Sequence, residues 1–120
     1  MNKEELHIKA VKAATQCILR RGWEVIDTDW ESVCGGHIDL VAEDNGELVF
    51  IEVTETEDLE RGFLDSNSNQ NQMEIMAARW LAASSPADGD LKIRFDIISL
   101  IVLNEQRALL RHHMNVFNHA

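Results

Sequence analysis

The chain has 120 residues, 45% of them hydrophobic, and its 21 acidic against 11 basic side chains give a net charge of −10. This length and hydrophobic content predict one globular domain over residues 1–120. The negative charge disfavours DNA or RNA as a partner, because cationic side chains supply most of the affinity for phosphate backbones. No apolar run is long enough to cross a membrane, and no signal peptide opens the chain, so we expect no membrane partner and a cytoplasmic location.

Apolar periodicity predicts two kinds of element within this domain. In chain order they are a helix over residues 4–21, strands over 23–30, 38–42 and 48–53, a helix over 73–81, and strands over 91–103 and 107–114. The polar stretch from 56 to 72 is expected to be a connecting loop, and Pro86 to Gly89 a turn. The order α-β-β-β-α-β-β predicts an α/β fold, with a mixed sheet of about five strands flanked by two helices.

The turn of the central hairpin sets its register. Asn45-Gly46 between two apolar runs is the strongest short-range hairpin signal, because both residues tolerate the positive φ of a type I′ turn. Side chains alternate along a strand, so each face of the hairpin collects every second residue. A two-residue turn places on one face the pairs Val41–Phe50, Asp39–Glu52 and His37–Thr54. The other face is expected to be buried under the helices and holds Ile38, Leu40, Ala42, Val49, Ile51 and Val53.

Asp39 and Glu52 form an unusual pair in this hairpin. Like charges that face each other across two strands destabilise the pairing. A bound divalent cation, a raised pKa or basic neighbours would account for them. Equally, the two carboxylates would be unremarkable on a solvated edge of the sheet, and the residues alone leave both interpretations open.

Three segments carry a resemblance to a known family. They read GHIDLVAEDNGELVFIEV from Gly36, RFDII from Arg94 and HHMNVF from His112. They are similar to the G-E-I-D-L-I-A, V-F-V-E-V-K, R-F-D-V and H-I-x-N-A-F elements of the YraN-like family of predicted nucleases. The similarity extends from the first helix to Phe117. It implies a restriction-endonuclease-like fold, in which an Asp on one strand and a Glu-x-Lys on the next hold a metal ion that activates water.

The resemblance assigns roles to particular residues. Asp39, Glu52 and the backbone carbonyl of Val53 would hold Mg²⁺ or Mn²⁺, and Asp39, Glu52 and Thr54 occupy the catalytic positions. Thr54 stands where the family has the lysine that positions the nucleophile. His37 stands where the family has Glu, and it is either a third metal ligand or base, for which imidazole favours Mn²⁺ or Zn²⁺ over Mg²⁺, or a hydrogen-bonded loop residue.

Other positions also depart from the family. Val11 replaces a glutamate of the first helix, and Asn69 replaces a lysine that commonly starts the second. Lys12 is the nearest candidate for a lysine that has migrated along the chain. These departures predict an endonuclease-like protein with a degenerate active site, whose cleavage of nucleic acid is weak or absent.

Two alternative functions do not involve catalysis. The chain could be a nucleic-acid-binding module, or a homodimerising domain that pairs through the long apolar strand and the sheet edge. In the second case, the pair His112-His113 either contributes to the dimer or is simply exposed.

Overall fold

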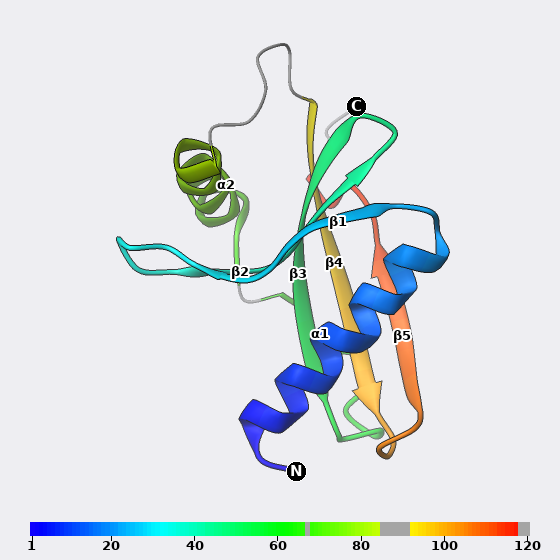
Figure 1. The fold of residues 1–120 in the computed structure, drawn as a ribbon. Helices are drawn as coiled ribbons and strands as arrows, with labels where there is room; N and C mark the ends of the chain where they lie inside the picture. Colours follow the sequence, from blue (N-terminus) through cyan, green and yellow to red (C-terminus); the bar gives the residue numbers. More distant parts are fainter. Residues whose placement is uncertain (67, 85–91, 118–120) are drawn as a thin grey trace.

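A computed structural model of the chain describes residues 1–66, 68–84 and 92–117, so the turn predicted from Pro86 to Gly89 lies outside the described residues. The elements are α1 (Lys3–Arg20), β1 (Glu24–Glu31), β2 (His37–Asp44), β3 (Glu47–Thr56), α2 (Gln70–Ser84), β4 (Lys92–Val102) and β5 (Ala108–His113) (Figure 1). The predicted order of elements is confirmed. Neither helix is long and apolar enough to span a lipid bilayer within the described ranges.

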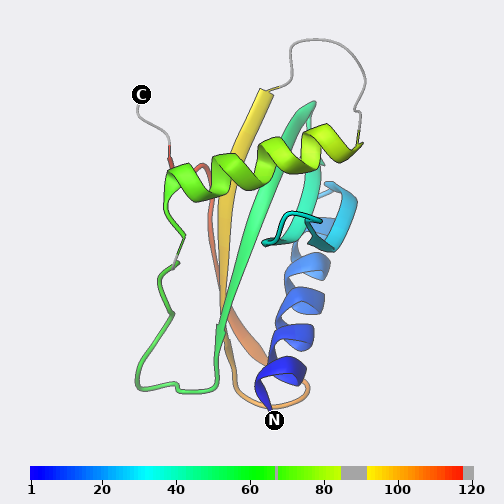
Figure 2. The ribbon, with the colours of Figure 1, turned by 90° about the vertical axis from the view of Figure 1, so that its left-hand side faces the viewer.

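The strands form one five-stranded mixed sheet in the order β1-β2-β3-β4-β5. β3 and β4 run parallel, whereas the other neighbouring strands pair antiparallel. A parallel pair needs a crossover connection, and α2 lies within the segment that joins β3 to β4. The helices lie on different sides of the sheet, with α1 oblique to the strands and α2 across them (Figures 1 and 2).

Local sequence explains how α1 begins and what it buries. The Asn2 side chain accepts a hydrogen bond of 2.8 Å from the backbone N–H of Glu5 and so caps the first turn. After the helix, Gly22 adopts a positive φ of 83°, which favours glycine. The inner face of α1 packs on the sheet in one apolar cluster with β2, β3 and β4. Its buried residues are Ala10, Val11, Ala14 and Ile18.

The hairpin between β2 and β3 has the predicted register near its turn. Asp44 pairs with Glu47 and Val41 with Phe50, and both turn residues have positive φ, 49° at Asn45 and 83° at Gly46. The two faces are buried against different helices. Leu40, Ala42, Val49, Ile51 and Val53 belong to the cluster under α1, and Val41, Leu48 and Phe50 belong to a second cluster with Ala77 and Trp80 of α2.

Ile38 is buried as predicted, but its predicted place on the same hairpin face as Leu40 and Ile51 is wrong. Ile38 is buried in the second cluster, with Val41 and Phe50. The β2–β3 ladder ends at the pair Leu40–Ile51, one step before the predicted pair Asp39–Glu52. Beyond that point the Asp39 carboxylate accepts the backbone N–H of Val53 at 2.7 Å, although the hairpin register would place Val53 opposite Ile38. The strands therefore separate at Asp39, and regular alternation stops there.

A buried polar network joins β4 to β5. Arg94 Nε donates to Asp96 Oδ1 at 3.0 Å, and His112 Nε2 lies 2.8 Å from Asp96 Oδ2. Arg94 also pairs with Asp44 at 3.0 Å and Glu47 at 3.4 Å. Burial would raise the pKa of Asp96, but hydrogen bonds from His112, Arg94 and a backbone N–H hold the pKa below its ordinary value.

This network departs from apolar periodicity on β4, and it corrects the expectation for His112. Arg94 and Asp96 are buried although they alternate with apolar residues, and Ile93 between Lys92 and Arg94 is exposed. His112 is neither exposed nor free to pair with a second chain, because its side chain is 1% exposed and packs edge-on against Trp23. The resemblance located the segments RFDII and HHMNVF, but apolar periodicity could not show that their polar side chains meet.

Candidate functional site

Asp39 occupies the point at which β2 and β3 separate. One of its carboxylate oxygens, Oδ2, accepts the N–H of Val53, which fixes the side chain against β3. The other oxygen, Oδ1, lies 2.8 Å from His37 Nε2 and 3.1 Å from His7 Nε2. The carboxylate is 8% exposed, so it is held mainly by protein groups and two imidazoles meet on one oxygen.

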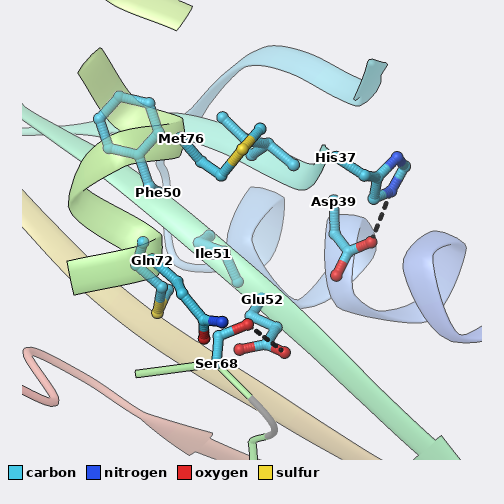
Figure 3. Close-up of a pocket in the computed structure, with 10 residues that line it drawn as sticks. His37, Asp39, Phe50, Ile51, Glu52, Ser68, Gln72 and Met76 are labelled. Atoms are coloured by element: carbon cyan, nitrogen blue, oxygen red, sulfur yellow. Dashed lines mark hydrogen bonds and ion pairs between the residues drawn. The ribbon is translucent and has the colours of Figure 1, made fainter. Parts of the chain in front are cut away.

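Glu52 is held by the segment that leads to α2. Hydroxyl groups of Ser66 and Ser68 donate to the two oxygens of its carboxylate. Figure 3 shows the Asp39 carboxylate pointing toward His37 and the Glu52 carboxylate pointing toward Ser68. The two acidic side chains therefore lie on adjacent antiparallel strands, as predicted, but each has its own polar partners.

One small cavity lies between these groups. It has a volume of about 170 Å³, and its lining includes His37, Asp39, Glu52 and Ser68 together with Met76 of α2 (Figure 3). Pockets for drug-sized ligands measure about 300–1,000 Å³, so this space suits water or an ion better than an organic ligand. Ten of the described residues line the cavity, and none of them is a lysine or an arginine.

The turn before β2 positions His37. Gly36 has a φ of 94°, which favours glycine, and a Cβ at this residue would lie 2.5 Å from Met76 Sδ, so glycine allows this approach to α2 without displacing the Met76 side chain. The guanidinium of Arg79 donates to the Gly35 carbonyl at 2.7 Å, which ties the turn to the same helix. The glycine pair that precedes His37 in the sequence therefore positions the start of β2, and with it the His37 side chain.

A second group of side chains surrounds the outer side of Asp39. Ligand-type atoms of His7, Asp29, His37 and Asp39 all lie within 4.8 Å of one another. Glu55 extends the group, because its carboxylate lies 2.7 Å from His7 Nδ1. Burial would lower the pKa of His7, but the hydrogen bond with Glu55 and the neighbouring carboxylates raise the pKa above its ordinary value. Burial is also the main cause of the raised pKa of Glu55.

The structure brings only some of the predicted site residues together. His37, Asp39 and Glu52 line the cavity, and Val53 adjoins it through the N–H that binds Asp39. Thr54 is not among the residues that line the cavity, and its hydroxyl donates to the Leu64 carbonyl at 3.1 Å. Three lie elsewhere. Val11 is in the apolar cluster under α1, Lys12 lines a second cavity near the β4–β5 turn, and Asn69 caps α2 by accepting the Gln72 N–H.

Sequence reasoning missed His7 and Asp29. His7 lies on α1 one helical turn before Val11, which occupies the position of the family's helix glutamate. The α1 side chain that reaches Asp39 therefore comes four residues earlier than the family pattern predicts. Asp29 lies on β1 beside the pair Thr28–Leu40 of the β1–β2 ladder, and its φ of 47° is unusual for a residue other than glycine. Neither placement was readable without knowing how α1 and β1 pack on β2.

Together, the mixed sheet, its two helices and the acidic pair on β2 and β3 define a protein of the restriction-endonuclease-like class by fold. The model of a family described as "Uncharacterised protein family UPF0102" matches residues 12–100, and the chain belongs to this family, the YraN-like group that its segments resemble.

Relatives in this family cover most of the chain. A UPF0102 protein of Carboxydothermus hydrogenoformans is 29% identical over 98% of this chain and 99% of its own length. One from Ruegeria pomeroyi is 34% identical over 73% of this chain and 74% of its own length. A third, from Rhodococcus opacus, is 28% identical over 87% and 88%. These names assign no activity, so the function has to be argued from the site.

Proposed function

We propose that the protein is an endonuclease-like member of its family with a degenerate active site, in which cleavage of nucleic acid is weak or absent. The observation that carries this proposal is the lining of the cavity. Asp39 and Glu52 border it, but neither lysine nor arginine is among its ten lining residues in the described part of the chain.

The donor set fits Mg²⁺ or Mn²⁺ in type. Asp39 and Glu52 would hold the ion, with the Val53 carbonyl as the third oxygen, and such an ion would activate a water molecule and offset negative charge on a phosphodiester. Two features weaken that assembly. Both Glu52 oxygens accept serine hydroxyls, and one Asp39 oxygen is shared by two imidazoles.

The threonine at residue 54, in place of the family's lysine, leaves the site without a positive charge at this position. A lysine at this position would place a positive charge beside the reacting water, whereas the Thr54 hydroxyl is neutral and donates to Leu64. Loss of one group that stabilises developing charge lowers a rate by about 10²–10³. The net charge of −10 reduces the encounter with a polyanion further.

A cleavage assay tests this proposal. The protein is incubated with single- and double-stranded DNA and RNA under Mg²⁺ or Mn²⁺, beside Asp39→Ala and the control Glu43→Ala, an exposed acidic residue on the same strand. We expect cleavage by the unmodified chain to be at or near background. Robust cleavage that Asp39→Ala abolishes and Glu43→Ala retains would show an intact active site. Binding of a substrate without cleavage would instead favour a nucleic-acid-binding module.

A further inference from the structure

We propose that His7, Asp29, His37 and Asp39 form a closed four-ligand site for a transition-metal ion of the Zn²⁺ type, which fastens α1 to β1 and β2. This site shares only Asp39 with the Asp39–Glu52 pair, and it does not depend on nuclease activity.

Four of the six distances within the cluster are near those of a tetrahedral site, and the other two are no longer than 4.8 Å. Metal–ligand bonds of about 2.0–2.1 Å set the ligand atoms of a tetrahedron about 3.3–3.4 Å apart. From Asp39 Oδ1, the imidazole nitrogens lie at 2.8 Å (His37) and 3.1 Å (His7). From Asp29 Oδ1, the same two nitrogens lie at 3.5 Å and 3.6 Å. The last two separations are too long for good hydrogen bonds but close to a tetrahedron edge.

Hydrogen bonds outside the cluster leave the right atoms free. His7 Nδ1 lies 2.7 Å from Glu55, which favours a proton on Nδ1 and a lone pair on Nε2, the atom that faces both aspartates. Carboxylate–histidine–metal arrangements of this kind orient metal-binding imidazoles in proteins. Asp39 likewise uses Oδ2 for the Val53 N–H and turns Oδ1 toward the imidazoles.

Charge and ligand type indicate the class of ion. Two carboxylates and two neutral imidazoles balance a divalent cation. Imidazole suits Zn²⁺ and similar ions, whereas Mg²⁺ prefers six oxygen ligands. Because all four ligands come from the protein, the site resembles structural zinc sites, which keep no open position for a substrate. Its ligands come from α1, β1 and β2, so the ion would join three separate elements.

Calorimetric titration of the full chain, carrying no histidine tag, with Zn²⁺ alone tests the proposal. We expect saturable binding of one ion per chain and a rise in the melting temperature on addition of Zn²⁺, because a ligand that binds only the folded state stabilises it. His7→Ala and His37→Ala should each abolish both effects. Both side chains are partly exposed, so the variants should fold, which circular dichroism without metal checks. Co²⁺ in place of Zn²⁺ should give the visible absorption of a tetrahedral complex.

Two controls separate this site from other possibilities. His113→Ala removes an exposed histidine on β5 and should leave binding unchanged. Glu52→Gln should also leave it unchanged, because Glu52 is not among the four ligands. Glu55→Gln should weaken binding by about 10–100-fold, the usual effect of removing the partner of a metal-binding imidazole.

The contrary outcomes are equally distinct. Absence of saturable Zn²⁺ binding overturns the proposal while leaving the degenerate nuclease reading untouched. Binding that survives His7→Ala and His37→Ala but is lost in Glu52→Gln overturns it too, because the ion would then sit at the Asp39–Glu52 pair.

Discussion

Gly36 is the residue at which local conformation most directly positions the site. Gly35 and Gly36 both have φ near 90°, so alanine at either is strained, by about 1–3 kcal/mol. Only Gly36 also lies against α2, where a Cβ would overlap Met76 Sδ. We expect Gly36→Ala to lower the free energy of unfolding by about 1 kcal/mol more than Gly35→Ala, because Met76 must move. Denaturant unfolding of both variants measures the difference.

A double-mutant cycle attributes that difference. If the Met76 contact causes it, Gly36→Ala should lose its extra effect in a Met76→Ala background, whereas the effect of Gly35→Ala should stay the same. Equal effects of the two alanines in the natural background would show that the turn tolerates a side chain at Gly36.

Asp96 should make stability depend on acidic pH. Its pKa is lowered in the folded state, so its contribution is full above the unfolded pKa of about 3.9 and is lost as pH falls through the folded value. The charged groups of the network are Arg94, Asp44 and Glu47, with His112 beside them. We expect Asp96→Asn to destabilise by about 3 kcal/mol at pH 7 and to flatten the loss of stability below pH 4.

Unfolding free energies from pH 7 down to pH 2 check this expectation. Asp65→Asn is the control, because the Asp65 side chain is fully exposed and should leave the natural pH profile unchanged. A natural profile in Asp96→Asn would mean that other carboxylates cause the acid sensitivity.

Whether the structural role of a residue could be predicted from the sequence depends on how close in the chain its determinants lie. Asp39, Glu52 and His37 were found because strand alternation and a family pattern place them near one turn. The burial of Arg94 and Asp96 was not predicted, because it depends on partners from the hairpin and from β5. No local rule allows two charged residues in a core strand unless those distant partners are known.

Among the elements, β3 is buried on both faces, each of which packs in an apolar cluster. Ile51 is 1% exposed and lies under α1, whereas Ile93 on the neighbouring β4 is 38% exposed. Ile51→Ala should lower the free energy of unfolding by about 2–5 kcal/mol through lost transfer energy and a cavity. Ile93→Ala, the same chemical change, should alter it by only about 0.5 kcal/mol. Urea unfolding compares them, and similar losses for both would contradict the packing of α1 on β3.

Element order, hairpin register and the burial of β3 were all predictable, since each follows from periodicity or from the Asn45-Gly46 turn. The separation of β2 from β3 was not. A side chain, Asp39, takes a backbone N–H that the ladder would otherwise use, and alternation rules assume that backbone groups pair with each other. The single departure from a regular hairpin is therefore also the centre of the candidate site.

For the whole molecule, a variant designed to restore activity must keep both the packing of the fold and the net charge. Adding the helix glutamate of the family at Val11 is excluded by packing, because Val11 is 4% exposed within the α1 cluster and a buried carboxylate would destabilise the fold. Thr54 and His37 are more accessible positions. Thr54→Lys with His37→Glu adds one positive and one negative charge, so the net charge stays at −10 and encounter with a polyanion is unchanged.

We expect this double variant to gain Mg²⁺-dependent nicking of about 10²-fold over the natural chain, because it supplies a positioned cation and a third carboxylate beside Asp39. Thr54→Lys alone should gain little, since His37 still contacts the Asp39 oxygen that would face the metal and the third carboxylate is missing. Thr54→Met with His37→Glu is the matched control, with a side chain of similar length and no charge. Nicking of plasmid DNA at two ionic strengths measures the rates. Equal rates for the lysine and methionine variants would mean that the missing charge at residue 54 is not what limits this site.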